Sequence, residues 1–277
     1  MSLILKLFAA VLPLCLLAAP PASTDPVAIP DKNLETAVRY YVLEKRGTAE
    51  PLTEEDLSKL SYLDAKGKGV RDLTGLEKCV NLAAVDLAGN QIADLTPIHG
   101  LTKLQSLDLS NNQVRDLGPL KGLVKLQRLV ISGNQVERLD ALSELTAITS
   151  LLMTGNKITD LTPIKNLTKL LTLDLEGNAV SDIAALKGMT KLTSLNLRNN
   201  KVADLSPLAA YTEIRDLLLE GNPVKDLGVL VEMARKDSEG PKLFAAYWRL
   251  YLPDGTGGGQ IAKLESYGVR VHAAAAK

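Results

Sequence analysis

The stretch LQSLDLSNNQVRDL, residues 104–117, decides the fold of this chain. Its aliphatic residues first alternate, at Leu107 and Leu109, which predicts a short β-strand with one buried face. After Asn112 they recur in steps of three, which predicts tight turns of 3₁₀ type. The stretch therefore predicts a strand, a bend and a return through short helical turns.

The same pattern repeats every 22 residues. Seven asparagines keep this spacing without a slip, and one step further back the series begins with Lys68 in a degenerate copy. Relative to this column, offsets −8, −5, −3, +2, +5, +8 and +11 are apolar in all eight copies, seven positions times eight or 56 in all. The asparagines are Asn90, Asn112, Asn134, Asn156, Asn178, Asn200 and Asn222.

One copy cannot fold alone. Its seven aliphatic side chains contribute roughly 14 kcal/mol on burial, whereas ordering 22 residues costs about 33 kcal/mol. Neighbouring copies must therefore share their apolar faces, as in a solenoid. We expect the asparagine amides to point inward and to form a structural ladder along the backbone, because this position recurs once in every turn.

In three further columns the residue type is explained by the local backbone conformation. Glycine stands before the asparagine column in six copies, and Asn111 and Asn199 stand there in the other two, which predicts positive φ at this bend. At +4 seven copies carry Asp, suited to capping the next turn, and Arg138 is the exception. Four copies carry Pro at +7, where the turn donates no hydrogen bond.

This pattern resembles the leucine-rich repeat family, in its 22-residue internalin-like class of bacterial exported proteins. The resemblance covers residues 60 to about 235. It implies an α/β leucine-rich-repeat solenoid, with parallel β-strands on a concave face and 3₁₀ or short helical turns on a convex face. Leucine, at 53 residues against two Phe and one Trp, agrees with such narrow, uniform interiors.

We expect four segments. Residues 1–22 resemble a secretory signal peptide, 23–59 form a linker and a helical N-terminal cap, 60–235 hold eight repeats, and 236–277 form a small α+β C-terminal cap. A lipoprotein anchored through Cys15 is the alternative to simple export, but bulky Leu14 precedes that cysteine.

The caps have patterns of their own. Residues 31–46 predict one amphipathic helix, and Thr53 predicts the start of a second, short one ending at Leu60. Near the C-terminus we expect a strand at 250–252, a helix over about 260–267 and a strand at 269–271. The aromatic residues Phe244, Tyr247, Trp248 and Tyr251 form either a hydrophobic lid or a ligand pocket.

The sequence predicts no enzyme, no cofactor and no metal site. The two histidines, His99 and His272, lie far apart in the chain, which leaves no histidine-based catalytic set. Cys79 falls in the +11 core column, so we interpret it as a buried hydrophobe. With 32 basic and 32 acidic residues, the chain has no basic excess for nucleic acid.

The remaining candidate for a functional site is the outward-facing surface of the strands. Offsets −6, −4 and −2 point outward from the strands, and we use "concave face" for these three columns. An acidic start at −4 gives way to apolar Val130 and Leu152. An exposed contact centre at these two residues is our hypothesis, although ordinary solvated surface with random drift is the simpler explanation. The candidate contacts are Asp64, Asp86, Asp108, Arg128, Val130, Leu152, Asp174, Asn196, Arg198 and Leu218.

The leading hypothesis is an exported module, monomeric and without a membrane span once the signal is removed, that binds an unidentified protein through the concave face. It would be secreted, periplasmic or on the cell surface. An envelope polysaccharide binder is one alternative, although the concave face offers only Tyr62 for stacking on sugars. A structural spacer without a specific ligand is the other.

Overall fold

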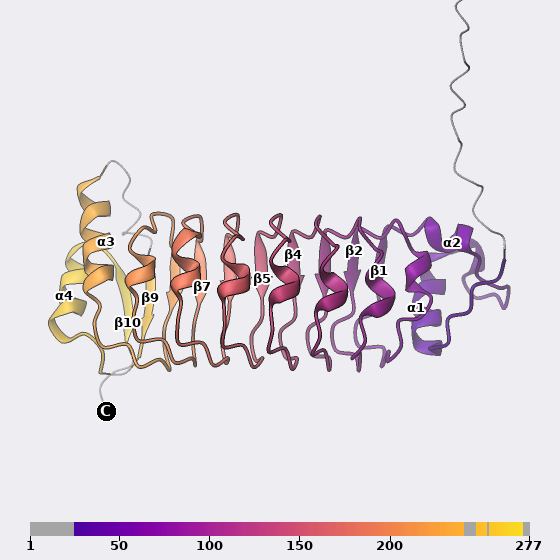
Figure 1. Cartoon of the computed structure of the whole chain (residues 1–277), viewed down its shortest axis with the longest axis horizontal. Helices are drawn as coiled ribbons and strands as arrows, with labels where there is room; N and C mark the ends of the chain where they lie inside the picture. The colour runs from indigo at the N-terminus through magenta and orange to yellow at the C-terminus, as the bar shows by residue number, and fades with distance from the viewer. Residues whose placement is uncertain (1–24, 241–247, 254, 274–277) are drawn as a thin grey trace, which may run out of the picture.

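The computed structural model describes residues 25–240, 248–253 and 255–273, and within them ten strands form one parallel sheet in chain order. Figure 1 shows the strands side by side in an almost straight stack, with helices at both ends. The strands are β1 (Tyr62–Asp64), β2 (Ala84–Asp86), β3 (Ser106–Asp108), β4 (Arg128–Val130), β5 (Ser150–Leu152), β6 (Thr172–Asp174), β7 (Ser194–Asn196), β8 (Asp216–Leu218), β9 (Arg249–Leu252) and β10 (Arg270–Ala273).

The register of the sheet follows the 22-residue period. Leu107 of β3 lies opposite Leu129 of β4, which lies opposite Leu151 of β5. Each column of the sequence therefore becomes a row of side chains in contact across neighbouring strands, about 4.8 Å apart.

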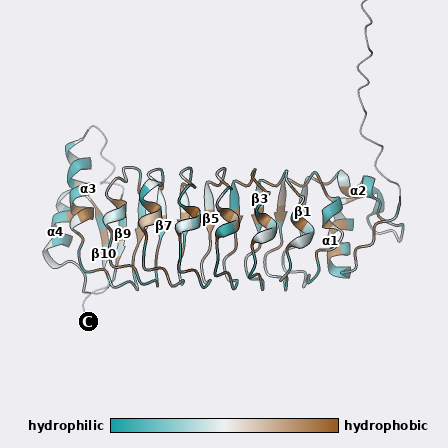
Figure 2. Cartoon of the chain, viewed as in Figure 1, coloured by the Kyte–Doolittle hydropathy of each residue, from teal (hydrophilic) through white to brown (hydrophobic). Residues whose placement is uncertain are grey.

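The interior consists of the predicted columns. All 56 apolar positions lie within the described residues and all of them are buried. Figure 2 shows apolar segments recurring in each turn of the stack. This arrangement confirms the predicted solenoid, in which every turn contributes its aliphatic side chains to a core shared with its neighbours.

The bend after each strand has the predicted left-handed backbone. The six glycines have φ between 63° and 72°, and Asn111 and Asn199 have φ of 54°. Only glycine and asparagine adopt this conformation at low cost. The copies are Gly67, Gly89, Gly133, Gly155, Gly177 and Gly221.

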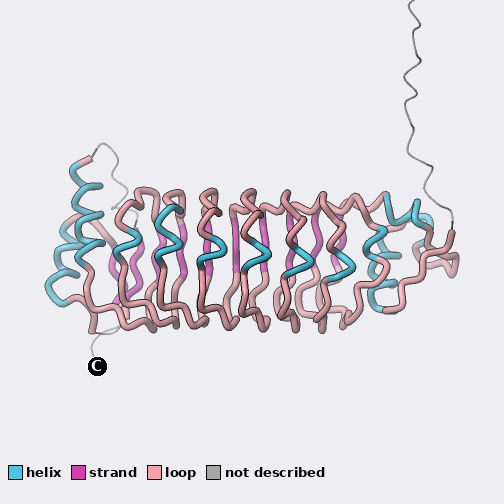
Figure 3. Tube along the Cα trace, viewed as in Figure 1, coloured by secondary structure: helices cyan, strands magenta, loops and turns pink. Residues whose placement is uncertain are grey.

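The return path runs through short 3₁₀ helices on the side opposite the strands (Figure 3). All seven Asp residues at +4 accept a hydrogen bond from the backbone N–H two residues later, at 2.7–2.8 Å, so each caps its turn. Arg138 instead pairs with Asp140 on the surface. The 3₁₀ helices are η2 (Leu76–Lys78), η3 (Thr96–Ile98), η4 (Gly118–Leu120), η5 (Asp140–Leu142), η6 (Thr162–Ile164), η7 (Ala184–Gly188) and η8 (Ser206–Leu208).

The N-terminal end carries α1 (Lys32–Tyr41), η1 (Leu43–Lys45) and α2 (Glu54–Ser58). The single helix expected over 31–46 was wrong, because the chain leaves α1 at Val42, which has extended φ and ψ of −89° and 92° and is buried. Thr53 starts α2 with a full capping box, as its sequence predicts, but the helix ends at Ser58 and not at Leu60.

The C-terminal end carries α3 (Gly228–Glu239) and α4 (Gly258–Ser266), which pack against each other and close the stack with β9 and β10. Helix α3 runs through residue 235, where we expected the repeats to end. Strand β10 begins one residue later than predicted and extends to Ala273. The predicted signal segment, Phe244 and Tyr247 lie outside the described residues.

Candidate functional site

The asparagine column lies inside the stack, where its side-chain amides form hydrogen bonds with backbone groups. Asn134 accepts a hydrogen bond from the Val114 N–H at 2.9 Å and donates to the carbonyls of Leu109 and Ile131 at 2.9 and 3.0 Å. The other six make the same three bonds at 2.7–3.1 Å. Each amide therefore joins its own turn to the turn before it.

The −4 column of the concave face also has a structural part. Asp64, Asp86, Asp108 and Asp174 each accept a hydrogen bond from the N–H two residues ahead, at 2.9–3.0 Å, and Asn196 does so at 3.1 Å. A carboxylate at this position ends the strand by forming a local turn. The acidic column thus has a local cause and is not by itself evidence of a ligand.

The expected apolar contact centre is less exposed than its sequence suggested. Val130 is only 5% exposed, and Leu152 is half-buried. Val130 lies between Asp108 and Leu152 on the neighbouring strands, and these side chains shield its short branched side chain. The expectation of an exposed Val130–Leu152 pair was therefore wrong, and only Leu152 with the exposed Arg128 offers surface here.

The C-terminal third of the concave face carries a network of fixed charges. Asn196 donates to Glu176 at 2.9 Å, and Arg198 makes two bonds to Glu220 at 2.7 and 2.8 Å. The interaction with Glu220, despite some opposing burial, raises the pKa of Arg198 further above its usual value. These side chains are held in place by their contacts with one another.

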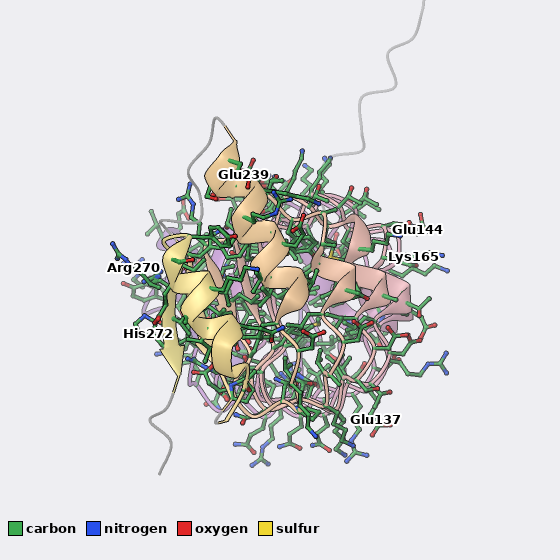
Figure 4. The ribbon with its side chains drawn as sticks, turned by 90° about the vertical axis from the view of Figure 1, so that its left-hand side faces the viewer. Glu137, Glu144, Lys165, Glu239, Arg270 and His272 are labelled. Carbon is green, nitrogen blue, oxygen red and sulfur yellow. The ribbon has the colours of Figure 1, made fainter. Side chains whose placement is uncertain are left out.

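Two rings extend this network across β9 and β10. Tyr251 stacks on His272 with ring centroids 4.6 Å apart, and the Arg198 guanidinium lies 5.2 Å from the Tyr251 ring. Leu218 is the half-buried neighbour of Tyr251 on β8. Figure 4 looks onto this end of the stack and shows His272 on the opposite side from Glu144 and Lys165.

The N-terminal end of the face holds aromatic residues that sequence reasoning missed. Tyr41 of α1 lies edge to face against Tyr62 of β1 at 5.6 Å, and against Tyr40 at 5.3 Å. Only Tyr62 lies in a concave column, so the pattern gave no sign that α1 would bring two more rings beside it. The amphipathic stripe that contains Tyr41 was the available signal.

The described part of the chain holds no cluster of metal ligands, no accessible thiol and no membrane-spanning helix. No group of three or more His, Cys, Asp or Glu residues there could hold a metal ion. Cys79 is fully buried, and burial, with a smaller contribution from Glu77, raises the pKa of its thiol to about 12. No helix among the described residues is long and apolar enough to span a bilayer.

A solenoid of this repeat, with an inward asparagine ladder and an outward strand face, defines a leucine-rich repeat protein. The family model for leucine-rich repeats in two copies matches residues 102–144, 146–188 and 168–210. No curated protein sequence matches the chain.

Solved structures narrow the class. The crystal structure of internalin C2 from Listeria monocytogenes is similar at 30% identity and a TM-score of 0.73, covering 77% of this chain and 96% of that one. The internalin InlF of the same species has 23% identity and a TM-score of 0.56, over 92% and 95% of the two chains. The chain belongs to the internalin-like class of leucine-rich repeat proteins.

A more distant neighbour shares the fold alone. It is the leucine-rich repeat ectodomain of the Arabidopsis thaliana receptor kinase GASSHO1/SCHENGEN3, with 20% identity and a TM-score of 0.53, over 65% of this chain and 22% of that one.

Proposed function

We propose that the chain is an exported, non-catalytic module that binds a protein partner through its concave face. The observation that carries this proposal is the network of Glu176, Asn196, Arg198, Glu220 and Tyr251, whose side chains are fixed by contacts with one another. Fixed side chains lose little conformational entropy on binding. Tyrosine and arginine are also the residues that most often dominate protein interfaces.

The size of the face suits a protein. Ten strands about 4.8 Å apart form a surface roughly 45 Å long, and a stable interface buries about 800 Å² on each partner. We place the contact centre over β5 to β9, with Leu152, Asn196, Arg198 and Leu218 in it. Asp174 on β6 lies within it and Arg128 on β4 lies beside it. Asp64, Asp86 and Asp108 flank it on the N-terminal side.

The comparisons support a binding role without naming a partner. Leucine-rich repeat proteins commonly mediate protein interactions, and the plant ectodomain is in complex with CASPARIAN STRIP INTEGRITY FACTOR 2. Export rests on the signal-like segment of residues 1–22. We expect the mature protein to begin near residue 23, which intact-mass measurement of the purified native protein would test.

The contact centre is tested with Leu152→Asp and Arg198→Ala in a quantitative capture experiment on envelope and culture fractions. Asp is the residue that four other repeats carry at the Leu152 position, so the fold should accept it. Lys165→Ala, on the side opposite His272, is the matched control (Figure 4).

We expect a partner that is captured by the unchanged protein and the control and is depleted about tenfold or more by either concave variant. A partner retained by both concave variants would refute this contact centre. Capture that fails for every version would instead favour a spacer.

A further inference from the structure

A pocket lies where the N-terminal cap meets the first repeat, away from the contact centre proposed above. It has a volume of about 720 Å³, within the range of small-molecule sites. Helix α1 packs beside β1 here, at the right-hand end of the stack in Figure 1. The lining residues are Thr36, Arg39, Tyr40, Tyr41, Arg46, Gly47, Asp64, Lys66 and Lys68.

Three tyrosine rings form a row, and two of them, Tyr40 and Tyr41, line this pocket. Tyr40, Tyr41 and Tyr62 follow one another in edge-to-face contact, and the Arg46 guanidinium lies 4.1 Å from the Tyr40 ring centroid. Tyr40 is 57% exposed and Tyr62 is 47% exposed, although tyrosine rings are usually largely covered in a folded protein. Arg46 covers one face of Tyr40, so the stacking surface for a ligand is the opposite face of this exposed ring.

The lining is strongly cationic for a chain with a net charge of zero. It contains two arginines and two lysines against the single carboxylate of Asp64, and because Glu35 neutralises Arg39, the cationic excess comes from Arg46, Lys66 and Lys68. Arg39 is held by Glu35 and by the carbonyl of Glu50, so its position is fixed. The pocket therefore selects for an anionic ligand.

Lys68 is available to this pocket because of its place in the repeat. It occupies the ladder column, but a ladder amide bonds to the turn before its own, and the first repeat has no such turn. Its side chain is exposed, while its backbone N–H donates to Asn90 of the next repeat at 3.1 Å. The ladder thus does not need an asparagine here, and a cation can stand in its place.

We infer that this pocket binds an acidic sugar, a pyranose ring that carries a carboxylate. The C–H face of the ring would stack on Tyr40, the carboxylate would lie between Lys66 and Lys68, and the tyrosine hydroxyls would bond to sugar hydroxyls. An extended acidic peptide fits less well, because α1 packs beside β1 and occupies the edge that such a peptide would extend.

The site is tested by calorimetric titration of the whole protein with α-1,4-trigalacturonate. Its methyl ester is the matched neutral probe, and a triglutamate peptide supplies the same charge without the ring. Lys66→Gln combined with Lys68→Gln removes the charge, Tyr40→Ala removes the stacking face, and Lys165→Gln controls for net charge on the far side. Every changed residue is exposed, so each variant should keep the native circular dichroism spectrum.

We expect the acid to bind, the ester and the peptide to bind at least about fivefold more weakly, and both pocket variants to weaken the acid by about fivefold or more. Lys165→Gln should leave binding unchanged. No binding of the acid would overturn the inference, as would equal binding of the peptide or insensitivity to Tyr40→Ala. Because Leu152 and Arg198 are left intact in these variants, the outcome is separate from that of the capture experiment.

Discussion

The first repeat and the seven that follow are joined to the segment before them in different ways. In the later repeats an internal asparagine bonds to the backbone of its own turn and of the turn before it. In the first repeat that position is Lys68, and Asp31 of the cap bonds to other N–H groups of the first turn. The Asp31 carboxylate accepts hydrogen bonds from the N–H groups of Arg71 and Asp72 at 2.7 and 3.2 Å, while also capping α1 through Asn33 and Leu34.

The difference shows that the ladder acts backward along the chain. Each ladder asparagine bonds to backbone groups of the repeat before it, so only a repeat that follows another repeat needs an asparagine in this column. Asp31 completes the exposed start by joining the cap to the first turn, and it leaves the side chain of Lys68 without a structural task.

The largest effect is expected from removing an interior rung. Asn156→Ala leaves the Val136 N–H and the carbonyls of Ile131 and Met153 without the bonds that the amide makes. We expect a loss of about 3 kcal/mol in the free energy of unfolding, measured by denaturant titration. Lys68→Ala, in the same column, should change stability by no more than about 0.5 kcal/mol. Equal losses at the two positions would contradict the contrast.

Asp31→Ala should have the next largest effect. It removes a helix cap and two bonds to the first repeat together, so we expect a loss of about 2 kcal/mol. The loss should be local, and hydrogen exchange should increase in α1 and at Arg71 and Asp72 more than in β5 to β7. Uniform exchange along the stack would show that Asp31 does not join the cap to the first turn.

A smaller effect should appear on acidification. Burial alone would raise the pKa of Asp31, but bonds from the backbone of Arg71, Leu34, Asp72 and Asn33 outweigh it and lower that pKa. Its stabilisation is therefore complete above the unfolded pKa of roughly 3.9 and is lost as the pH falls through the lower folded value. The stability difference between the unchanged protein and Asp31→Asn should be constant from about pH 7 to pH 5 and should shrink below about pH 4. If the stability difference between the two proteins grew on acidification, the lowered pKa of Asp31 would be contradicted.

The smallest effect concerns the one turn without its Asp cap. Arg138→Asp restores the residue of the other seven repeats and gives up only an exposed ion pair with Asp140, in which the arginine is 84% exposed. We expect a gain of about 0.5 kcal/mol. Arg138→Ala, which loses the ion pair without adding a cap, should show no gain.

The interior could be predicted because its causes repeat. Leu107, Gly133 and Asp160 each stand in a column whose members meet the same neighbours in every turn, so one physical argument serves all copies. The outward face was harder to predict. The burial of Val130 depends on Asp108 and Leu152, which lie 22 residues away on each side. Val42 continues the apolar period of the helix and is buried as that period predicts, but the period does not show that the backbone becomes extended there.

The aromatic pocket could not be predicted for a related reason. Tyr41 and Tyr62 belong to different structural units, and only the angle at which α1 meets the first strand brings their rings together. The charged network at the other end similarly requires β9, which follows a spacer longer than one repeat. The aromatic pocket and the charged network both lie at the ends of the repeat array. The 22-residue pattern that predicts the core therefore does not predict them.

The backward bonding of the amides gives the molecule an order of assembly. A ribosome produces the chain from the cap onward, and every rung from Asn90 to Asn222 finds its carbonyl and N–H partners already synthesised. A nascent chain can therefore add finished turns one at a time without waiting for residues still to be translated. By the same geometry, deleting or duplicating a whole unit of 22 residues recreates the same contacts between neighbouring repeats. Such a gene can therefore change the length of its product without needing a new interface between repeats.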